Sequence, residues 1–310
     1  MNTEKLPETL REAVIYFADE DRAHEFFVAM RWPDGVTCAH CNSANVGKLV
    51  VTTVKGKDGK PDKVRRVWNC KACKKQFTAK VGSIFHDSAL PLAKWLPALW
   101  LVVNAKNGVS SCELARSLGV TQKTAWHMGH RIRTSIQRGG GIVNLNGVVE
   151  VDETWIGGSA RNMHKAKKAK VMKGVQNTAL TPVMGLLERG TRDKASRIRL
   201  QIIGSTKRAE LHGNVRKYVL KGAEVHTDAL YAYRGLDADY THKVVDHAVA
   251  YVQDGVHTNS LENFWSLLKR SIKGTYVHCA SFHLFRYLEH FLVNLSHIGR
   301  DGRSGCNGMG

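Results

Sequence analysis

The sequence lacks long apolar runs. No window of about 18 apolar residues occurs, so no membrane-spanning helix is predicted. The opening residues, Met1 to Lys5, have no apolar core of the kind found in signal peptides. No G-x-x-x-x-G-K-[ST] loop is present, so no energy from nucleotide hydrolysis is implied. Because no G-x-S-x-G elbow occurs either, nothing supports an acyl-enzyme mechanism.

Acidic residues are scarce relative to basic ones. The 310 residues include 27 Asp and Glu against 46 Lys and Arg, which gives a net charge of +19 and a pI near 9.8. Such an excess indicates a polyanionic partner, nucleic acid before a membrane surface, although a merely solvated basic surface is the alternative. The length predicts roughly two or three domains.

Cysteines are few, but four of the seven form two Cys-x-x-Cys pairs, Cys38 with Cys41 and Cys70 with Cys73. This usage fits a reducing compartment and metal binding better than a disulfide framework. Each pair can wrap a knuckle around one ion, and four thiolates make a closed structural zinc site. A hairpin around the turn at 56–61 would fill the gap between the pairs. Four ordinary buried cysteines, or His40 replacing one ligand, are the alternatives.

Residues 110–136 have the pattern of a helix-turn-helix. Gly119 ends a short first helix, and Thr121 caps a second helix that begins at Gln122. The second helix carries side chains able to meet major-groove edges and phosphates, namely Gln122, Lys123, His127, His130, Arg131 and Arg133. A plain pair of antiparallel helices with a solvated basic face is the alternative.

The chain divides into six predicted segments. Strands followed by a strand-helix alternation between 147 and 295 predict an α/β domain, a sheet with helices packed on it. The segments are an N-terminal helical part (1–31), a zinc ribbon (32–86), a helix-turn-helix domain (88–138), a Gly-rich linker (139–146), the α/β domain (147–295) and a disordered tail (296–310).

Three carboxylates have the arrangement that a two-metal nuclease needs. Asp152 ends one strand-like run (148–152), Asp228 ends another, and Glu262 lies in an amphipathic helix predicted over 259–272. Two divalent ions about 4 Å apart need oxygen ligands that converge from separate elements. A lone Glu on a helix is usually only solvated, but Glu262 has two strand-end aspartates upstream. Glu153 points to the opposite strand face and is interpreted as structural.

Basic residues accompany these carboxylates. The stretch 161–173 contains Lys165, Lys167 and Lys168 and directly follows the strand that carries Asp152. We therefore expect it to bind phosphates. A mobile solvated loop is the alternative. Lys269, Arg270 and Lys273, after Glu262, are expected to contact the DNA backbone. His257 precedes the helix and is expected either to orient a ligand or phosphate or to cap the helix.

With these residues, the sequence resembles the DDE transposases of bacterial insertion sequences, in the zinc-ribbon group related to eukaryotic Merlin elements. The resemblance runs from about residue 26 to residue 294. It is carried by Arg31–Gly35, the four cysteines, Val151–Gly158, His226–Asp228 and His257–Arg270.

The resemblance implies a ribonuclease-H-like catalytic domain that uses two Mg²⁺ or Mn²⁺ ions to cut double-stranded DNA at terminal inverted repeats and transfer the strands. Branches of the family have either Glu or Asn as the third catalytic residue, and this chain offers Glu262 and Asn259. Glu262 is preferred, because a carboxylate binds a hard cation better than an amide.

The resemblance also implies a protein of the bacterial cytoplasm, associated with the nucleoid, that acts as a dimer or larger assembly because two DNA ends must meet. Two other functions remain open at this point. One is a zinc-ribbon regulator whose nuclease-like domain is silent. The other is a stand-alone nuclease that selects branched or hybrid structures.

Overall fold

The computed structural model describes residues 6–49, 52–54, 63–105, 107–138, 144–157, 165, 180–191, 194–245, 256–277 and 279–301; the side chains of 52–54, 63–65, 137–138 and 293–301 are left aside. The backbone divides into two compact units, one of residues 1–102 and 111–132 and the other of residues 103–110 and 133–310. Within the described residues, no helix combines the length and the apolar character that a membrane crossing needs.

Two helices begin the first unit, α1 (Leu10–Ala18) and α2 (Glu20–Arg31). Thr9 and Glu12 form a capping box at the start of α1. The Asp19 carboxylate accepts hydrogen bonds from two backbone amides at the start of α2. Helix α1 buries Ala13 and Phe17, and α2 buries Ala23. The helices predicted before residue 31 are therefore present.

A small sheet follows, with β1 (Val46–Lys48), β4 (Trp68–Cys70) and β5 (Gln76–Phe77) in the order β1-β4-β5. The separate strands β2 (Thr52–Val54) and β3 (Lys63–Arg65) pair antiparallel, as the predicted hairpin requires, whereas the turn between them lies outside the described residues. Trp68 and Phe77 stack at 6.0 Å beside the cysteines and form the core of this region.

Three helices complete the unit and lead out of it: α3 (Leu92–Asn104), α4 (Ser111–Leu118) and α5 (Gln122–Arg138). Gly119 has a φ of +60°, a conformation that L side chains rarely adopt, and this lets the chain turn sharply between α4 and α5. The helix-turn-helix pattern of the sequence is thus formed with its expected boundary.

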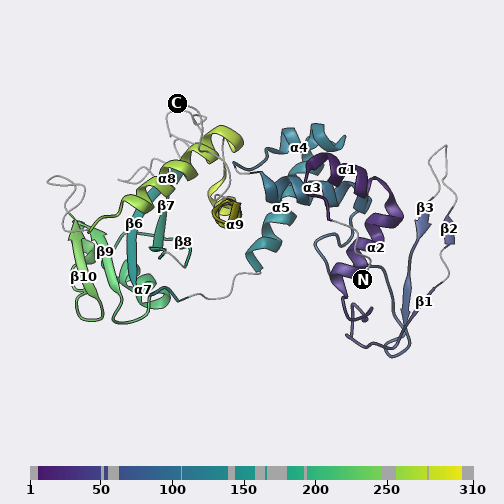
Figure 1. The fold of residues 1–310 in the computed structure, drawn as a ribbon, viewed down its shortest axis with the longest axis horizontal. Coiled ribbons are helices and arrows are strands. Elements are labelled where there is room, and N and C mark those ends of the chain that lie inside the picture. Colours follow the sequence, from purple (N-terminus) through teal and green to yellow (C-terminus); the bar gives the residue numbers. More distant parts are fainter. Residues whose placement is uncertain are drawn as a thin grey trace. The chain divides into compact units, whose positions relative to one another are not determined.

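The second unit contains a five-stranded sheet (Figure 1). Its strands lie in the order β10-β9-β6-β7-β8 and are β6 (Val148–Gly157), β7 (Leu180–Glu188), β8 (Arg197–Ile202), β9 (Glu224–Asp228) and β10 (Thr241–Val245). Strands β6, β7 and β8 are antiparallel neighbours, whereas β9 and β10 run parallel to β6. This mixed order confirms the ribonuclease-H-like fold that the resemblance implies.

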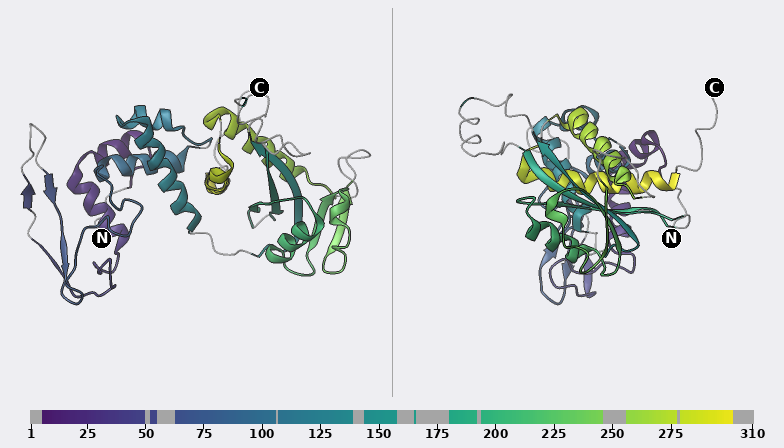
Figure 2. Two further views of the ribbon diagram at one scale, coloured as in Figure 1. Left: turned by 180° about the vertical axis from the view of Figure 1, so that it is seen from behind. Right: turned by 90° about the vertical axis from the view of Figure 1, so that its left-hand side faces the viewer.

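Helices cover both faces of the sheet (Figure 2). The alternation of side chains along β6 separates two cores. Val149 and Val151 pack toward α7 (Arg208–Tyr218), whereas Ile156 packs toward α8 (Asn259–Ser271) and α9 (Leu284–Asp301). The short helices are η2 (Tyr231–Tyr233), η3 (Ile272–Tyr276) and η4 (Ser281–His283).

Three predicted segments differ from the structure or fall outside it. Helix α9 continues to Asp301, so residues 296–301 are helical, whereas the sequence predicts that a disordered tail starts at Ser296. The reason is that the amphipathic pattern of α9 continues past residue 295 before the Gly-rich end. Most of the Gly-rich linker and of the basic stretch 161–174, including Lys167 and Lys168, lies outside the described residues.

Candidate active site

Asp152 and Asp228 lie on adjacent parallel strands. In the pairing of β6 with β9, Val148 lies opposite Glu224 and Glu150 lies opposite His226. Asp152 follows Glu150 by two residues on β6, and Asp228 follows His226 by two residues on β9. Because side chains alternate, Asp152 and Asp228 share the sheet face that α8 covers, with Glu150 and His226. The two strand-borne carboxylates therefore come from neighbouring positions on one face.

Glu262 reaches the same face from α8. The Leu261 amide donates to Glu150 Oε2 at 2.9 Å, and Trp265 Nε1 donates to Asp152 Oδ2 at 3.0 Å. Glu262 lies in the first turn of the helix, between these two attachment points, and its side chain is half-buried. The structure thus brings together the three carboxylates that the sequence singled out, with Asn259 at the start of the same helix.

The electrostatics of Asp152 report this proximity. The pKa of Asp152 is raised to about 6. Burial is the main cause, the negative charges of Asp228 and Glu262 add to it, and hydrogen bonds donated by the Glu153 amide and Trp265 oppose it. The hydrogen-bond donors around Asp152 therefore do not offset the negative charge that gathers there. A divalent cation would stabilise such a site.

The donor set fits a hard cation. Carboxylate oxygens are the ligands that Mg²⁺ and Mn²⁺ prefer, and no thiolate or imidazole competes among the three side chains. In the described part of the chain, only the four cysteines of the ribbon form a metal-ligand group within 4.8 Å of one another.

Glu153 lies on the other face of the sheet, as the alternation predicts. The Tyr233 hydroxyl donates to its carboxylate, and burial raises the pKa of Glu153 to about 7. Tyr233 belongs to the core between the sheet and α7. Glu153 is therefore separated by the sheet from the side on which α8 lies.

Sequence reasoning missed the buried group beneath the start of α8. The Glu150 side chain is fully buried, and Arg189 donates to it through Nε at 2.6 Å. Arg189 Nη2 lies 2.8 Å from His257 Nδ1 and 2.7 Å from the His257 carbonyl oxygen. Burial lowers the pKa of His257, with Arg189 adding to the effect. The sequence pattern that could have indicated Glu150 is its position two residues before Asp152, which places both side chains on the same face of the strand.

The four cysteines form a second candidate site. The sulfur of Cys38 lies 3.7 Å from that of Cys73, and the sulfur of Cys41 lies 3.6 Å from that of Cys70. Four thiolates at about 2.3 Å from one zinc ion are about 3.8 Å apart along the edges of the tetrahedron. The distances are too long for disulfides. Backbone amides of His40 and Cys41 lower the pKa of Cys38, although burial opposes them. The group fits the zinc ribbon predicted from the sequence.

Helix α5 exposes only part of its predicted DNA-binding set. Gln122, Lys123, His127 and Arg131 are exposed, but His130 and Arg133 are only 6% and 4% exposed. The expectation that these last two meet DNA is therefore wrong. The two positions are three residues apart and so lie on one side of the helix, and contacts within the fold cover that side.

Arg133 and His130 have partners inside the protein instead. Arg133 stacks over the rings of Tyr276 and Tyr287 at 5.0 and 4.7 Å and donates to the Val109 carbonyl oxygen at 3.2 Å. The His130 ring lies 4.0 Å from that of Trp126. Both side chains therefore contribute to packing.

The remaining predicted DNA contacts are exposed wherever the structure describes them. Lys269 and Arg270 lie at the end of α8, and Lys273 lies in the π-helical turn η3 that continues it. Lys165 is exposed as well. The basic side chains of α8 and η3 thus follow Glu262 along one continuous helical segment.

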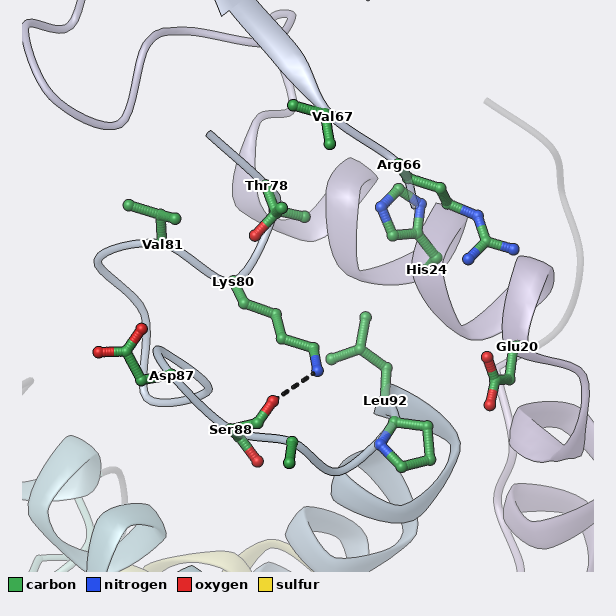
Figure 3. A pocket seen from close by; sticks show the side chains of 13 residues that line it. Glu20, His24, Arg66, Val67, Thr78, Lys80, Val81, Asp87, Ser88 and Leu92 are labelled. Atoms are coloured by element: carbon green, nitrogen blue, oxygen red, sulfur yellow. Dashed lines mark hydrogen bonds between the residues drawn. The ribbon is translucent and has the colours of Figure 1, made fainter. Parts of the chain in front are cut away.

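A cavity of about 440 Å³ lies in the first unit (Figure 3). It is lined by residues of α2, the ribbon and the start of α3, including His24, Arg66 and Leu92. The Lys80 ammonium projects into it and donates to the carbonyl oxygens of Ser88 and Leu90 at 3.2 and 2.6 Å. These bonds tie the end of the ribbon to the segment that enters α3, so the cavity marks a structural junction.

Comparison with known proteins agrees with these two sites. Residues 144–292 match the family described as the ISXO2-like transposase domain, and residues 18–76 match the transposase zinc-ribbon domain. An uncharacterized protein in the transposable element ISH50 of Halobacterium salinarum is 25% identical over 270 residues, which cover 82% of this chain and 83% of the relative.

Among solved structures, a chain of the cryo-EM structure of the simian T-cell lymphotropic virus intasome in complex with PP2A regulatory subunit B56 gamma is similar at 12% identity. The TM-score is 0.27, and the match covers 58% of this chain and 63% of that one. The match thus spans less than two thirds of the length of the intasome chain. The family matches, in contrast, include the four cysteines, Asp152, Asp228 and Glu262.

Proposed function

We propose, from the premise that the chain belongs to the zinc-ribbon DDE transposases of insertion sequences, that it cuts and joins DNA at the ends of its element. The observation that carries the proposal is the placement of Asp152, Asp228 and Glu262 on one face of the sheet, from β6, β9 and α8. Three separate elements supply carboxylates to one charged region, as a two-ion phosphoryl-transfer centre requires.

Each residue has a distinct part in this proposal. Asp152 and Asp228 hold cations from the sheet, and Glu262 completes the set from α8; Asn259 is the alternative third ligand on the same helix. These side chains would hold Mg²⁺ or Mn²⁺, which would supply activation of the attacking hydroxyl and stabilisation of the leaving 3′ oxygen. The Trp265 indole holds the Asp152 carboxylate in one orientation through its 3.0 Å hydrogen bond.

DNA binding is assigned to the exposed basic side chains. Lys123, His127 and Arg131 are spaced four residues apart on α5 and form one stripe along the helix. Lys269 and Arg270 contact the DNA backbone beside the carboxylates, and the zinc ribbon binds the transposon end together with α5. The net charge of +19 supports a polyanionic partner.

The assembly on DNA is proposed to contain at least two copies of the chain. Strand transfer from both ends of an element requires two active sites acting in concert on one target. We therefore expect a homodimer or larger assembly when the protein is bound to end-bearing DNA.

Strand cleavage of DNA carrying the element's ends, measured with and without Mg²⁺, tests the proposal. Asp228→Asn is expected to lower the cleavage rate at least about a hundredfold, because a metal centre contributes several kcal/mol to such a step. DNA binding is expected to persist. Asp237→Asn is the matched control, because its side chain is 71% exposed. Wild-type cleavage by Asp228→Asn would overturn the catalytic assignment, and binding without any cleavage by the wild-type protein would indicate a regulator.

A further inference from the structure

The Glu150 carboxylate is fully buried between Arg189, which follows β7, and the start of α8. It accepts from Arg189 Nε at 2.6 Å and from the Leu261 amide at 2.9 Å, and His257 Nδ1 lies 3.4 Å away. A buried carboxylate is costly unless it is both paired and hydrogen-bonded. Arg189 pairs with Glu150 from the end of β7, whereas the hydrogen bond from Leu261 exists only while α8 stays in this position.

The start of α8 depends on this group. Thr258 is the N-cap residue but makes no side-chain capping hydrogen bond, and its hydroxyl instead lies 3.4 Å from Glu262 Oε1. Helix N-termini leave amides that need acceptors, and a carboxylate there also interacts favourably with the helix dipole. Glu150 supplies that carboxylate from a strand that lies 111 residues earlier in the chain.

Two attachments fix α8 along β6. Glu150 accepts a hydrogen bond from the Leu261 amide, and Asp152 accepts one from the Trp265 indole. Two residues of a strand advance about 6.6 Å, and four residues of a helix advance about 6.0 Å. One attachment is made by a backbone amide and the other by the Trp265 side chain, and both are present in this register of the helix against the strand. Glu262 lies between them, and its position along β6 is set by that register.

Arg189 links the carboxylate to the chain that enters the helix. The guanidinium bridges Glu150 to the His257 carbonyl oxygen, which it reaches at 2.7 Å, one residue before the N-cap. Arg189 follows β7 directly, and its amide donates to the Val148 carbonyl oxygen at 2.9 Å. The brace therefore joins β6, β7 and the segment before α8.

We propose that Glu150 and Arg189 are positioning residues for the third carboxylate: they hold the first turn of α8 in the register that places Glu262 beside Asp152. This inference rests on the proposed function for its effect on catalysis. The positioning itself is a property of the chain without metal or DNA, and it is testable separately.

The test compares Glu150→Gln and Glu150→Ala by amide hydrogen exchange in the metal-free protein. Exchange at Leu261 and Glu262 is expected to be about tenfold faster in Glu150→Ala and intermediate in Glu150→Gln, since glutamine keeps one acceptor oxygen but loses the charge facing Arg189. Leu261 also donates to the Thr258 carbonyl oxygen at 3.0 Å, so the helix keeps its own bond there. In cleavage assays, the Mg²⁺ concentration for half-maximal rate is expected to rise about tenfold, with DNA binding unchanged.

Glu188→Gln is the matched control. The Glu188 side chain is also buried, at 4% exposure, and its partners among the described residues are Arg197, Lys194 and the Asn146 amide, which lie outside α8. This variant is expected to lower stability while leaving exchange in the first turn of α8 and the Mg²⁺ dependence unchanged. Equal effects of Glu150→Gln and Glu188→Gln on both readouts would overturn the proposal, as would unchanged exchange in Glu150→Ala. If Asp228→Asn cleaves normally but Glu150→Ala loosens α8, the positioning stands and the proposed function fails.

Discussion

Gly185 lies opposite Asp152 in the register of β6 and β7, and the Trp265 indole passes over it. A Cβ atom at this position would lie 2.6 Å from Trp265 Cζ2 and 2.9 Å from Trp265 Cη2, closer than real contacts allow. The absence of a side chain at residue 185 is therefore what allows α8 to approach the sheet closely enough for Trp265 to reach Asp152.

We predict that Gly185→Ala lowers the free energy of unfolding by about 1–3 kcal/mol, because overpacking displaces side chains in a filled core. Cleavage is expected to fall as well, since Trp265 moves away from Asp152. Gly213→Ala is the control: no atom lies within 4 Å of its added Cβ, and replacing an exposed helical glycine by alanine stabilises by about 1 kcal/mol. Chemical denaturation measures both, and an unchanged stability of Gly185→Ala would contradict the packing argument.

His24 stacks on Trp68 with ring centroids 5.6 Å apart, and burial lowers its pKa to about 4, with Lys48 and Lys80 adding to the effect. The folded state therefore holds His24 neutral, whereas the unfolded chain takes up a proton near pH 6.5. The stability that this group contributes is complete above pH 6.5 and is lost as the pH falls toward 4.

His24→Phe keeps an aromatic ring on Trp68 but removes the titration. We predict that the melting temperature of the variant falls less between pH 7.5 and pH 5 than that of the wild-type protein. Loss of zinc in acid affects both proteins alike, so the difference between them isolates His24. Parallel curves of melting temperature against pH would show that His24 does not contribute.

At the scale of the element, α5 separates two kinds of basic residue. Lys123 and Arg131 are exposed on one stripe, whereas Arg133 is buried against Tyr276 and Tyr287. Only the exposed stripe is able to approach phosphates. The buried arginine contributes cation–π contacts and a hydrogen bond to the Val109 carbonyl oxygen.

The double variant Lys123→Ala, Arg131→Ala is predicted to weaken DNA binding and to reduce the slope of log affinity against log salt by about 2, since each lost phosphate contact releases about one counterion fewer. Lys207→Ala, an exposed lysine before α7, is the control for general charge loss. Arg133→Ala is expected to lower stability instead. A salt slope equal to that of the wild-type protein in the double variant would remove α5 from the interface.

At the scale of the whole molecule, the chain has two units with different sources of stability. The second unit buries two apolar clusters, one on each face of its sheet. The ribbon buries only a small cluster around Trp68, Phe77 and the cysteines. Small domains of this kind generally need a metal to fold.

Removal of zinc by a chelator is therefore predicted to unfold the ribbon and abolish the DNA-end binding proposed for it, while the thermal transition of the second unit persists. Limited proteolysis is expected to cut first within residues 32–86. Cys73→Ser should reproduce the effect, whereas Cys112→Ser, an exposed cysteine outside the cluster, should not. A ribbon that resists proteolysis after metal removal would show that its apolar core suffices.

The sequence alone determined most of the elements and their order, because local periodicity and turn residues report backbone conformation directly. Gly119 marked the turn before α5, the two cysteine pairs marked the ribbon, and alternation along β6 placed Asp152 and Glu153 on opposite faces. These features depend on neighbours within a few positions.

The tertiary structure alone decided which helical positions are buried and what holds α8 to the sheet. His130 and Arg133 face inward because other segments pack on that side of α5, and the Glu150 bond to Leu261 joins residues 111 positions apart. No local pattern encodes such pairs, since burial and hydrogen bonding across the fold depend on which surfaces meet. The charge that surrounds Asp152 likewise exists only once β6, β9 and α8 have come together.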